Sequence, residues 1–206
     1  MAERGDSYFN PVSRTRLVFV ELPRDNGGIR MVMDWFVAAG EGLVGAAHYH
    51  AGPDGFVSEK FELVSGTALC RIGGREHRAD APHTFDIPCN TVHVHPRNAG
   101  QGEMHVRQTI LLAEPDLPVI EGAERFFETV AALAQKNKVN RNGDIRDPLQ
   151  SVLTLSETLL DPTWLPVVPQ PIQRMSFGLG AAVARMLGYK AHHLPVKEAA
   201  APLAQS

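Results

Sequence analysis

Two histidines, His48 and His50, stand two residues apart in the chain. Side chains at positions i and i+2 of a strand point to the same face, so both imidazoles can reach one metal ion if this segment is extended. Imidazole nitrogen is a common ligand of divalent transition metals. The chain has nine histidines, and so short a pattern also arises by chance. The spacing alone is therefore weak evidence for a metal site.

A carboxylate strengthens the metal hypothesis. Glu59 is followed at alternate positions by Phe61 and Leu63, which places it on the apolar, inward face of a predicted strand. Glu62 falls on the opposite face together with Lys60. An ionised carboxylate that points into a protein core is costly unless it is paired or binds a metal. The strand pattern therefore selects Glu59 over Glu62 as a ligand.

A third imidazole follows a turn-forming segment. Pro88 and Asn90 favour a tight loop that brings His93 into the next strand. His95 shares a face with His93 and is the alternative ligand. Three neutral imidazoles and one carboxylate around a divalent ion leave one or two coordination positions open. Such a set accepts one Fe, Mn, Ni, Cu or Zn ion, and ligand type does not choose among these metals.

These residues resemble the two metal-binding motifs of the cupin superfamily, in its small single-barrel type. The matching residues are Gly42, His48, His50, Glu59 and Gly66 for the first motif, and Pro88, Asn90, His93 and Asn98 for the second. The resemblance covers residues 42–112. It implies a cupin barrel, also called a double-stranded β-helix or jelly roll, in which His48, His50, Glu59 and His93 hold one metal ion.

The chain departs from the family pattern in three places. The spacer between His50 and Glu59 has eight residues, more than the family usually has, and we expect residues 52–55 to bulge outward as a turn. Asn90 stands where the family has glycine, and asparagine tolerates a positive φ better than most residues. Asn98 lies one residue later than in the family pattern.

The elements that must position the ligands are predicted to be short strands. Segments rich in β-branched, aromatic or alternating apolar residues are separated by Gly, Pro, Asn and Asp. Short strands at close spacing, with no helix between them, predict an antiparallel sandwich or barrel. The predicted strands are residues 16–21, 29–38, 44–50, 60–71, 75–79, 84–87, 92–95 and 105–112.

The pattern changes near residue 115. Apolar residues at helical spacing predict a helix over residues 120–135. Asp147 and Pro148 predict the start of a second helix, whose apolar face includes Leu159 and Leu160, and a third helix is predicted over 172–187. We therefore expect an all-β barrel at residues 1–115, followed by an α-helical C-terminal extension at residues 116–206.

Several side chains are predicted to face the barrel interior beside the ligands. Gln108 lies on the apolar face of its strand, where it would hydrogen-bond a substrate or a metal-bound water, or serve as a satisfied core amide. Met33 and Trp35 alternate in the same way and, with Phe61, are predicted to line a substrate pocket. A plain hydrophobic core is the alternative for these three residues.

Composition excludes several classes of function. The net charge is −3 and Lys and Arg are scattered, which argues against a nucleic-acid partner. The N-terminus is polar, and no apolar run is long enough for a transmembrane helix. Two cysteines without paired spacing suit reduced thiols, so we expect a cytoplasmic protein. A weaker hypothesis places residues 172–187, with Arg174 and Arg185 at the margins, on a membrane surface.

Two functions are consistent with these residues. The first is a metal-dependent enzyme, most simply a dioxygenase, acting on a small oxygenated organic molecule such as an enol, a diketone or a phenol. Isomerase or decarboxylase chemistry is a variant in which the ion acts as a Lewis acid. The second is a non-catalytic binding or sensing module, or a barrel that has lost its metal and binds a ligand with the same polar residues. The resemblance also implies a homodimer, because cupin barrels commonly pair through their outer sheets.

Overall fold

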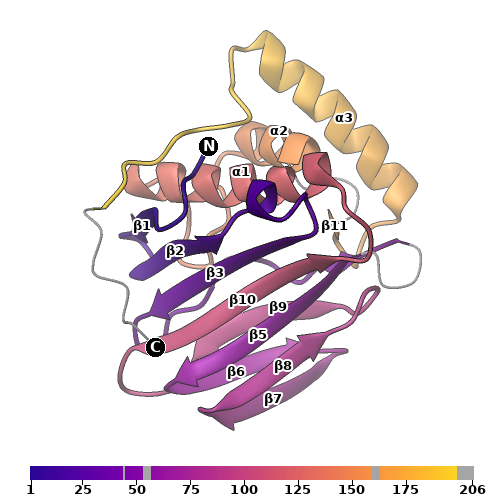
Figure 1. Cartoon of the computed structure of the whole chain (residues 1–206). Coiled ribbons are helices and arrows are strands. Elements are labelled where there is room, and N and C mark those ends of the chain that lie inside the picture. The colour runs from indigo at the N-terminus through magenta and orange to yellow at the C-terminus, as the bar shows by residue number, and fades with distance from the viewer. Residues whose placement is uncertain (44, 53–56, 159–162, 199–206) are drawn as a thin grey trace.

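The computed structural model describes residues 1–43, 45–52, 57–158 and 163–198 (Figure 1). Strands β1 to β10 occupy the chain up to Leu112, and three helices and the short strand β11 follow. The strands are β1 (Ser7–Asn10), β2 (Thr15–Glu21), β3 (Arg30–Val37), β4 (Tyr49–His50), β5 (Val57–Ser65), β6 (Thr67–Ile72), β7 (Arg75–Asp80), β8 (His83–Ile87), β9 (His93–Asn98), β10 (Met104–Leu112) and β11 (Thr163–Trp164). The helices are α1 (Leu117–Gln135), α2 (Pro148–Thr158) and α3 (Gln170–Met186), and a 3-10 turn covers Pro23–Asp25.

The strands form two main sheets. The larger sheet has the order β1-β2-β3-β10-β5-β8, and the smaller has the order β7-β6-β9. A short pair, β11-β4, joins the segment after α2 to the segment that carries His50. All the pairings are antiparallel. Buried side chains from both main sheets belong to one hydrophobic core, so the predicted antiparallel barrel is confirmed.

The strand boundaries differ from prediction in several places. The sequence predicted one strand over residues 60–71, but the structure has β5 and β6, which are separated at Gly66. Gly66 has a φ of +89°, and a Cβ there would lie 3.0 Å from the Cα of Met104. Only glycine fits this combination of backbone angle and close approach. Strand β1 was not predicted. The predicted strand 44–50 was too long, because among its described residues only Tyr49–His50 form a strand, β4. Val44 lies outside the described residues, and so does most of the predicted turn at 52–55.

The alternation predicted for the inner face of the larger sheet is confirmed. Gln108 of β10 stands opposite Met33 of β3 on one side and Phe61 of β5 on the other. All three side chains are completely buried. Trp35 pairs with the next inward position of β10 and is also buried. Glu59 lies one inward position along β5 from Phe61, so the same face presents it to the barrel interior.

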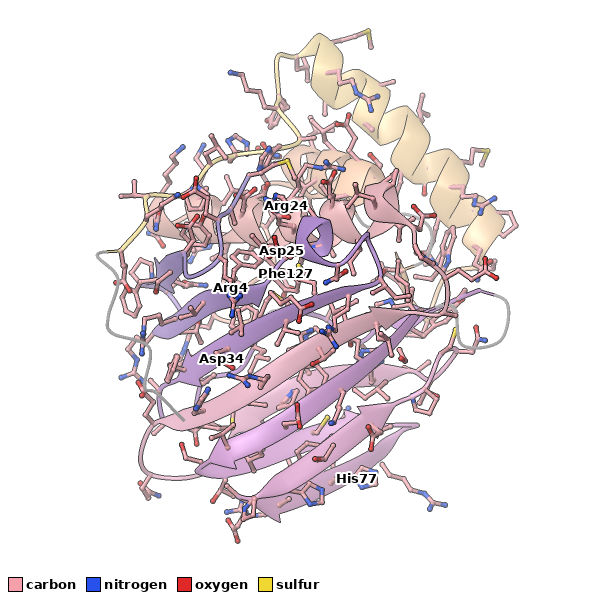
Figure 2. All side chains as sticks on the ribbon, viewed as in Figure 1. Arg4, Arg24, Asp25, Asp34, His77 and Phe127 are labelled. Atoms are coloured by element: carbon pink, nitrogen blue, oxygen red, sulfur yellow. The ribbon has the colours of Figure 1, made fainter. Side chains whose placement is uncertain are left out.

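An ion pair joins the outer side of β3 and β10, and its carboxylate, Asp34, is labelled in Figure 2. Asp34 of β3 stands opposite Arg107 of β10 and accepts hydrogen bonds from its Nε at 2.8 Å and its Nη2 at 2.9 Å. The ring of His105 lies 3.4 Å away. Burial alone would raise the pKa of Asp34, but the hydrogen bonds and charges of these two partners outweigh it and lower the pKa to about 2. The carboxylate therefore favours the folded state when it is ionised.

Helix α1 completes the core of the barrel. It begins at Leu117, earlier than the predicted residue 120, because the Asp116 side chain caps it by accepting from the Val119 amide at 3.2 Å. Phe127 points from this helix to the sheet and packs edge-on against Trp35, with ring centroids 5.6 Å apart (Figure 2). Buried residues of the barrel and of α1 belong to one hydrophobic core. The division of the chain into two domains after residue 115 stays a prediction.

Helices α2 and α3 form an outer layer. Asp147 caps α2 as predicted, since its Oδ1 accepts from the Leu149 amide at 2.9 Å; Leu159 and Leu160 lie outside the described residues. Helix α3 packs on α2 through a small cluster of Leu153, Ala181 and Ala184, and its outer face exposes several large apolar side chains. Within the described residues, every helix is too short or too polar to span a bilayer. Membrane-surface binding by α3 stays a prediction.

Candidate metal centre

His48 and His93 are held together by the backbone. They stand opposite each other in an antiparallel bridge. The amide of His48 donates to the carbonyl of His93 at 3.1 Å, and the amide of His93 donates back at 2.9 Å. Their ring centroids lie 4.2 Å apart. This bridge joins the two segments that resemble separate motifs in the sequence, so the two rings reach the same point.

His50 is positioned by the loop that precedes His93. Its carbonyl accepts from the Asn90 amide at 2.7 Å and from the Cys89 thiol at 3.1 Å. Asn90 has a φ of +62°, which confirms that asparagine replaces the usual glycine of this loop in a left-handed conformation. Asn98, the third departure from the family pattern, is buried in β9, and its side-chain amide donates to backbone carbonyls of a nearby turn and of β3.

The structure brings the four predicted ligands together. One donor atom from each of His48, His50, Glu59 and His93 lies within 4.8 Å of all the others. Ligand atoms about 2.1 Å from a common ion lie up to about 4.2 Å apart, so small side-chain adjustments suffice to bind one ion. All four residues are almost completely buried. Residues of two motifs that are distant in sequence thus meet inside one antiparallel barrel. This is the arrangement that the resemblance to the two cupin motifs implies.

Comparisons with known proteins give likeness of fold only. No protein-family model and no curated protein sequence matches this chain. A predicted oxalate decarboxylase from Thermotoga maritima is 14% identical, with a TM-score of 0.42 over 48% of this chain and 80% of that chain. KdgF from Halomonas sp. is 17% identical, with a TM-score of 0.38 over 48% of this chain and 80% of its own. The Cupin_2 domain of an XRE family transcriptional regulator from Enterobacter cloacae is also 17% identical, with a TM-score of 0.38 over 48% of this chain and 98% of that domain.

The protein backbone holds the second ring nitrogens of His48 and His93. Nδ1 of His48 lies 2.9 Å from the carbonyl of Ala46, and Nδ1 of His93 lies 2.9 Å from the carbonyl of Thr91. A carbonyl only accepts, so both Nδ1 atoms carry a proton, which leaves the Nε2 lone pair of His48 available to a metal. Nε2 of His93 instead hydrogen-bonds to the carboxylate of Glu59; burial alone would lower the pKa of His93, but this carboxylate raises it, so a metal ion would have to displace that proton. Burial lowers the pKa of His48 well below its usual value, and the neighbouring imidazoles add to this effect. Neutral imidazole is the form that binds a metal.

His50 carries the observation that points most directly to an ion. Its Nδ1 lies 3.0 Å from the hydroxyl of Thr163 in β11. Its Nε2 is buried and has no hydrogen-bond partner among the described residues; the nearest carboxylate oxygen, Oε2 of Glu59, is 3.5 Å away. Buried polar atoms are normally satisfied, and an orphaned nitrogen calls for an explanation. A metal ion between this nitrogen and the other three ligands supplies one.

Glu59 is the common neighbour of the imidazoles. Its Oε2 lies 2.8 Å from Nε2 of His93 and 3.2 Å from Nε2 of His95, while its Oε1 accepts from Nε2 of Gln108 at 2.9 Å. Burial alone would raise the pKa of Glu59, but the charge of His95 and the hydrogen bonds with His93 and His95 lower it well below its usual value. The carboxylate is therefore ionised, as a metal ligand must be.

His95, the alternative to His93, has a different position. It contacts the carboxylate of Glu59 but does not belong to the group of four whose donor atoms converge. Its ring stacks at an angle against His93 and lines the cavity beside the centre. The geometry therefore favours His93 as the ligand and leaves His95 on the cavity wall.

The predicted substrate-binding residues lie behind the ligands. Gln108 accepts from Nε1 of Trp35 at 2.9 Å and donates to Glu59 at 2.9 Å, so both ends of its amide are engaged within the protein. These are the contacts of a satisfied core amide that orients a ligand. Met33, Trp35 and Phe61 are buried and do not line the cavity beside the centre. Substrate contact by these residues stays a prediction.

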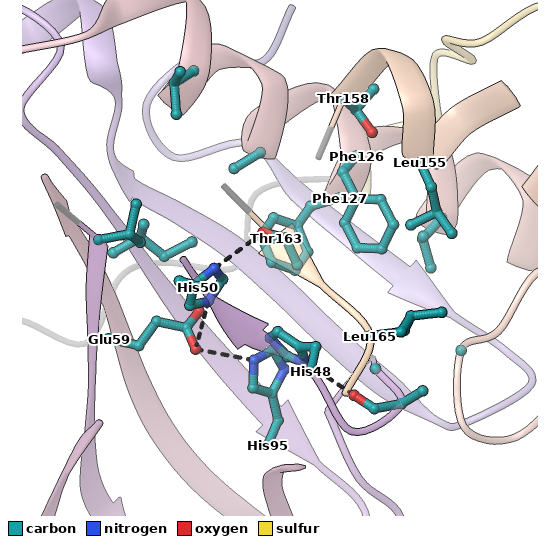
Figure 3. A pocket seen from close by; sticks show the side chains of 18 of the residues that line it. His48, His50, Glu59, His95, Phe126, Phe127, Leu155, Thr158, Thr163 and Leu165 are labelled. Atoms are coloured by element: carbon teal, nitrogen blue, oxygen red, sulfur yellow. Dashed lines mark hydrogen bonds and ion pairs between the residues drawn. The ribbon is translucent and has the colours of Figure 1, made fainter. Parts of the chain in front are cut away.

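A cavity of about 160 Å³ opens directly on the centre (Figure 3). His48, His50, Glu59 and His95 form one side of it. The rest is mostly apolar and comes from β5, β10, helices α1 and α2, and the segments that flank them. The apolar lining residues are Val57, Ile110, Leu112, Val119, Ile120, Ala123, Phe126, Phe127, Val130, Ile145, Leu155 and Leu165. Sequence reasoning missed the helical part of this lining, because an apolar helix face predicts packing without saying against what.

Proposed function

We propose that the chain is a metal-dependent cupin enzyme that binds one divalent ion through His48, His50, Glu59 and His93. The ion would hold a small oxygenated organic molecule in the adjoining cavity, and a dioxygenase reaction is the simplest chemistry. The observation that carries this proposal is the orphaned Nε2 of His50 beside three further buried donors, at the floor of a cavity.

The residues present fit a divalent transition metal. Three imidazoles and one carboxylate are nitrogen and oxygen donors of intermediate softness, which suit Fe, Mn, Ni, Cu and Zn. The alternative is a metal-free barrel, in which Glu59 would be a buried carboxylate supported only by imidazoles and one amide. That alternative leaves the buried Nε2 of His50 unexplained.

When bound, the ion would supply a Lewis-acidic site or, for Fe, Ni or Cu, a redox-active site for substrate and dioxygen. The chain's own residues hold and shield that site. The carbonyls of Ala46 and Thr91 fix the rings of His48 and His93, and Gln108 fixes the carboxylate of Glu59. The apolar walls lower the polarity around the site, which would strengthen the attraction between the ion and a charged oxygen.

The test begins with the metal and then asks for turnover. Elemental analysis of the full chain, purified without added metal, should give close to one equivalent of a transition metal, and the His48→Ala variant should lose it. The metal-loaded protein should consume oxygen with an enol, diketone or phenol, and the variant should not. Metal binding without oxygen consumption, over all three substrate classes, would refute the dioxygenase reaction.

A non-catalytic binding or sensing module is the second candidate. It is favoured by the small number of acid–base groups at the cavity, where His95 is the only described histidine besides the proposed ligands. Ligand binding without change of the ligand, both in air and without oxygen, would identify this function. Product formed without oxygen would instead identify isomerase or decarboxylase chemistry. A homodimer and a cytoplasmic location stay predictions.

A further inference from the structure

The helices that follow the barrel form the wall opposite the ligands. Ala123 and Phe126 of α1, Leu155 of α2 and Leu165 after β11 face the same cavity as His50 (Figure 3). This wall comes from the part of the chain that follows the strands β1 to β10. A ligand held at the centre would therefore extend its body toward these side chains, and their size and polarity decide which body fits.

The wall offers little to a polar or charged body. Among the described residues that line the cavity there is no lysine or arginine. The hydroxyl of Thr158 already donates to the carbonyl of Thr154 at 2.6 Å, and the carboxylate of Asp144 accepts from Asn140 at 2.9 Å. Ser151 remains as a polar neighbour. A second carboxylate or a row of hydroxyls would lose its hydration here without regaining equivalent partners.

The volume limits the body to about one ring. The cavity measures about 160 Å³, and an apolar protein cavity of roughly 150 Å³ binds benzene. Phe126 and Phe127 present aromatic surface to this space. Aromatic side chains favour stacked or edge-to-face contact with another ring. Ala123 of α1 and Leu155 of α2 line this space, so a larger body would press against them.

We propose that this site selects a ligand with a metal-binding oxygen head and an uncharged, apolar body of single-ring size, and that helices α1 and α2 set that selectivity. The inference rests on the proposed metal site. It goes beyond that site in naming the body of the ligand and the side chains that choose it. Ala123 and Leu155 are the residues that limit its size.

The test uses the full chain loaded with Co(II), whose visible absorption reports both metal binding and a ligand at the metal. Three probes are compared: catechol, 2,3-dihydroxynaphthalene and tartrate. The first two share one head and differ by a fused ring, and the third has a charged, hydroxylated body. We expect catechol to bind at least about tenfold more tightly than either of the others, since overpacking and unpaired polar groups each cost at least that much.

Two variants test the wall itself. Ala123→Phe fills the cavity and should lower the affinity for catechol by about tenfold or more. The Co(II) spectrum of the ligand-free protein should stay unchanged. Leu155→Ala enlarges the cavity and should reduce the ratio of the affinities for catechol and 2,3-dihydroxynaphthalene by about tenfold. This second variant keeps the test decisive if the first one folds poorly. Ala182→Phe, at an exposed position of α3, is the matched control and should behave as the wild type.

The outcomes separate the two proposals. Failure of the wild-type chain to bind Co(II) would refute the proposed metal site, and the ligand inference with it. Normal Co(II) binding, combined with equal affinity for the two aromatic probes or with tighter binding of tartrate, would overturn the ligand inference alone. So would unchanged probe affinities in both cavity variants.

Discussion

Thr163 links the helical half of the chain to the proposed metal centre. Its hydroxyl lies 3.0 Å from Nδ1 of His50, and its strand β11 pairs with strand β4, which carries His50. A group that holds the second nitrogen of a metal-binding histidine contributes about 10- to 100-fold to metal affinity, or about 1.4 to 2.7 kcal/mol. We expect Thr163→Val, which keeps the shape and removes the hydroxyl, to weaken metal binding by that factor.

The assay is a competition titration of the metal-free protein with Zn(II) against a chromophoric chelator. Thr163→Ser retains a hydroxyl and should bind Zn(II) close to the wild-type affinity. Unfolding of the metal-free proteins in urea is measured in parallel. The lost hydrogen bond should reduce the free energy of unfolding by only about 1 kcal/mol, so a selective effect on metal binding can be told from general destabilisation.

A double-mutant cycle decides whether the effect passes through His50. Thr163→Val is repeated in a protein that also carries His50→Ala. With the imidazole gone, the hydroxyl has no ligand to position, and the second substitution should cause no further loss of Zn(II) affinity. The reasoning is wrong if the valine variant binds Zn(II) as the wild type does, or if the two losses simply add.

Three further predictions use matched controls or the acid range. Glu59→Gln should lower Zn(II) affinity by more than about 100-fold because it removes a charged ligand, while Glu62→Gln should leave it unchanged in the same titration. Gly122→Ala should destabilise the fold by more than about 1 kcal/mol in urea unfolding, because its Cβ would overlap the backbone of α2. Gly178 has open space around it, so Gly178→Ala should stabilise α3 by up to about 1 kcal/mol. Equal effects of the two substitutions would contradict this packing. The Asp34 carboxylate has a folded-state pKa of about 2 against an ordinary 3.8, so it should contribute on the order of 2 kcal/mol above about pH 4 and lose this as the pH falls through 2. Asp34→Asn should remove that part of the acid dependence of unfolding, and an unchanged dependence would refute it.

The face of the strand on which Glu59 lies could be predicted, because it depends only on the local alternation of apolar and polar residues. Glu59 is 3% exposed, whereas the side chain of Glu62 is 41% exposed, as the pattern of their strand predicted. The pairing of His48 with His93 is a long-range contact that alternation cannot specify. Resemblance to two motifs supplied it, since the motifs imply that the two segments meet.

Local patterns also explain where the prediction of the barrel was wrong. Residues with strand character stand on both sides of Ser65 and Gly66, so composition alone predicts one strand over residues 60–71. The turn at Gly66 depends on its positive φ and on the nearby backbone of Met104, which lies far along the chain. A glycine within a strand pattern was the available signal for a turn.

The role of the segment after α2 could not be predicted, for a different physical reason. A two-residue strand such as β11 has no period, so nothing in its composition indicates that Thr163 reaches His50. The cavity also depends on small side chains, because Ala123 and its neighbour Gly122 lie on the buried side of α1 and leave space there. Helical spacing predicts that this side packs, but the space left over depends on how far α1 stands from the ligands. That distance follows from the contacts of α1 with both the sheet and α2, and only the folded chain contains all of them at once.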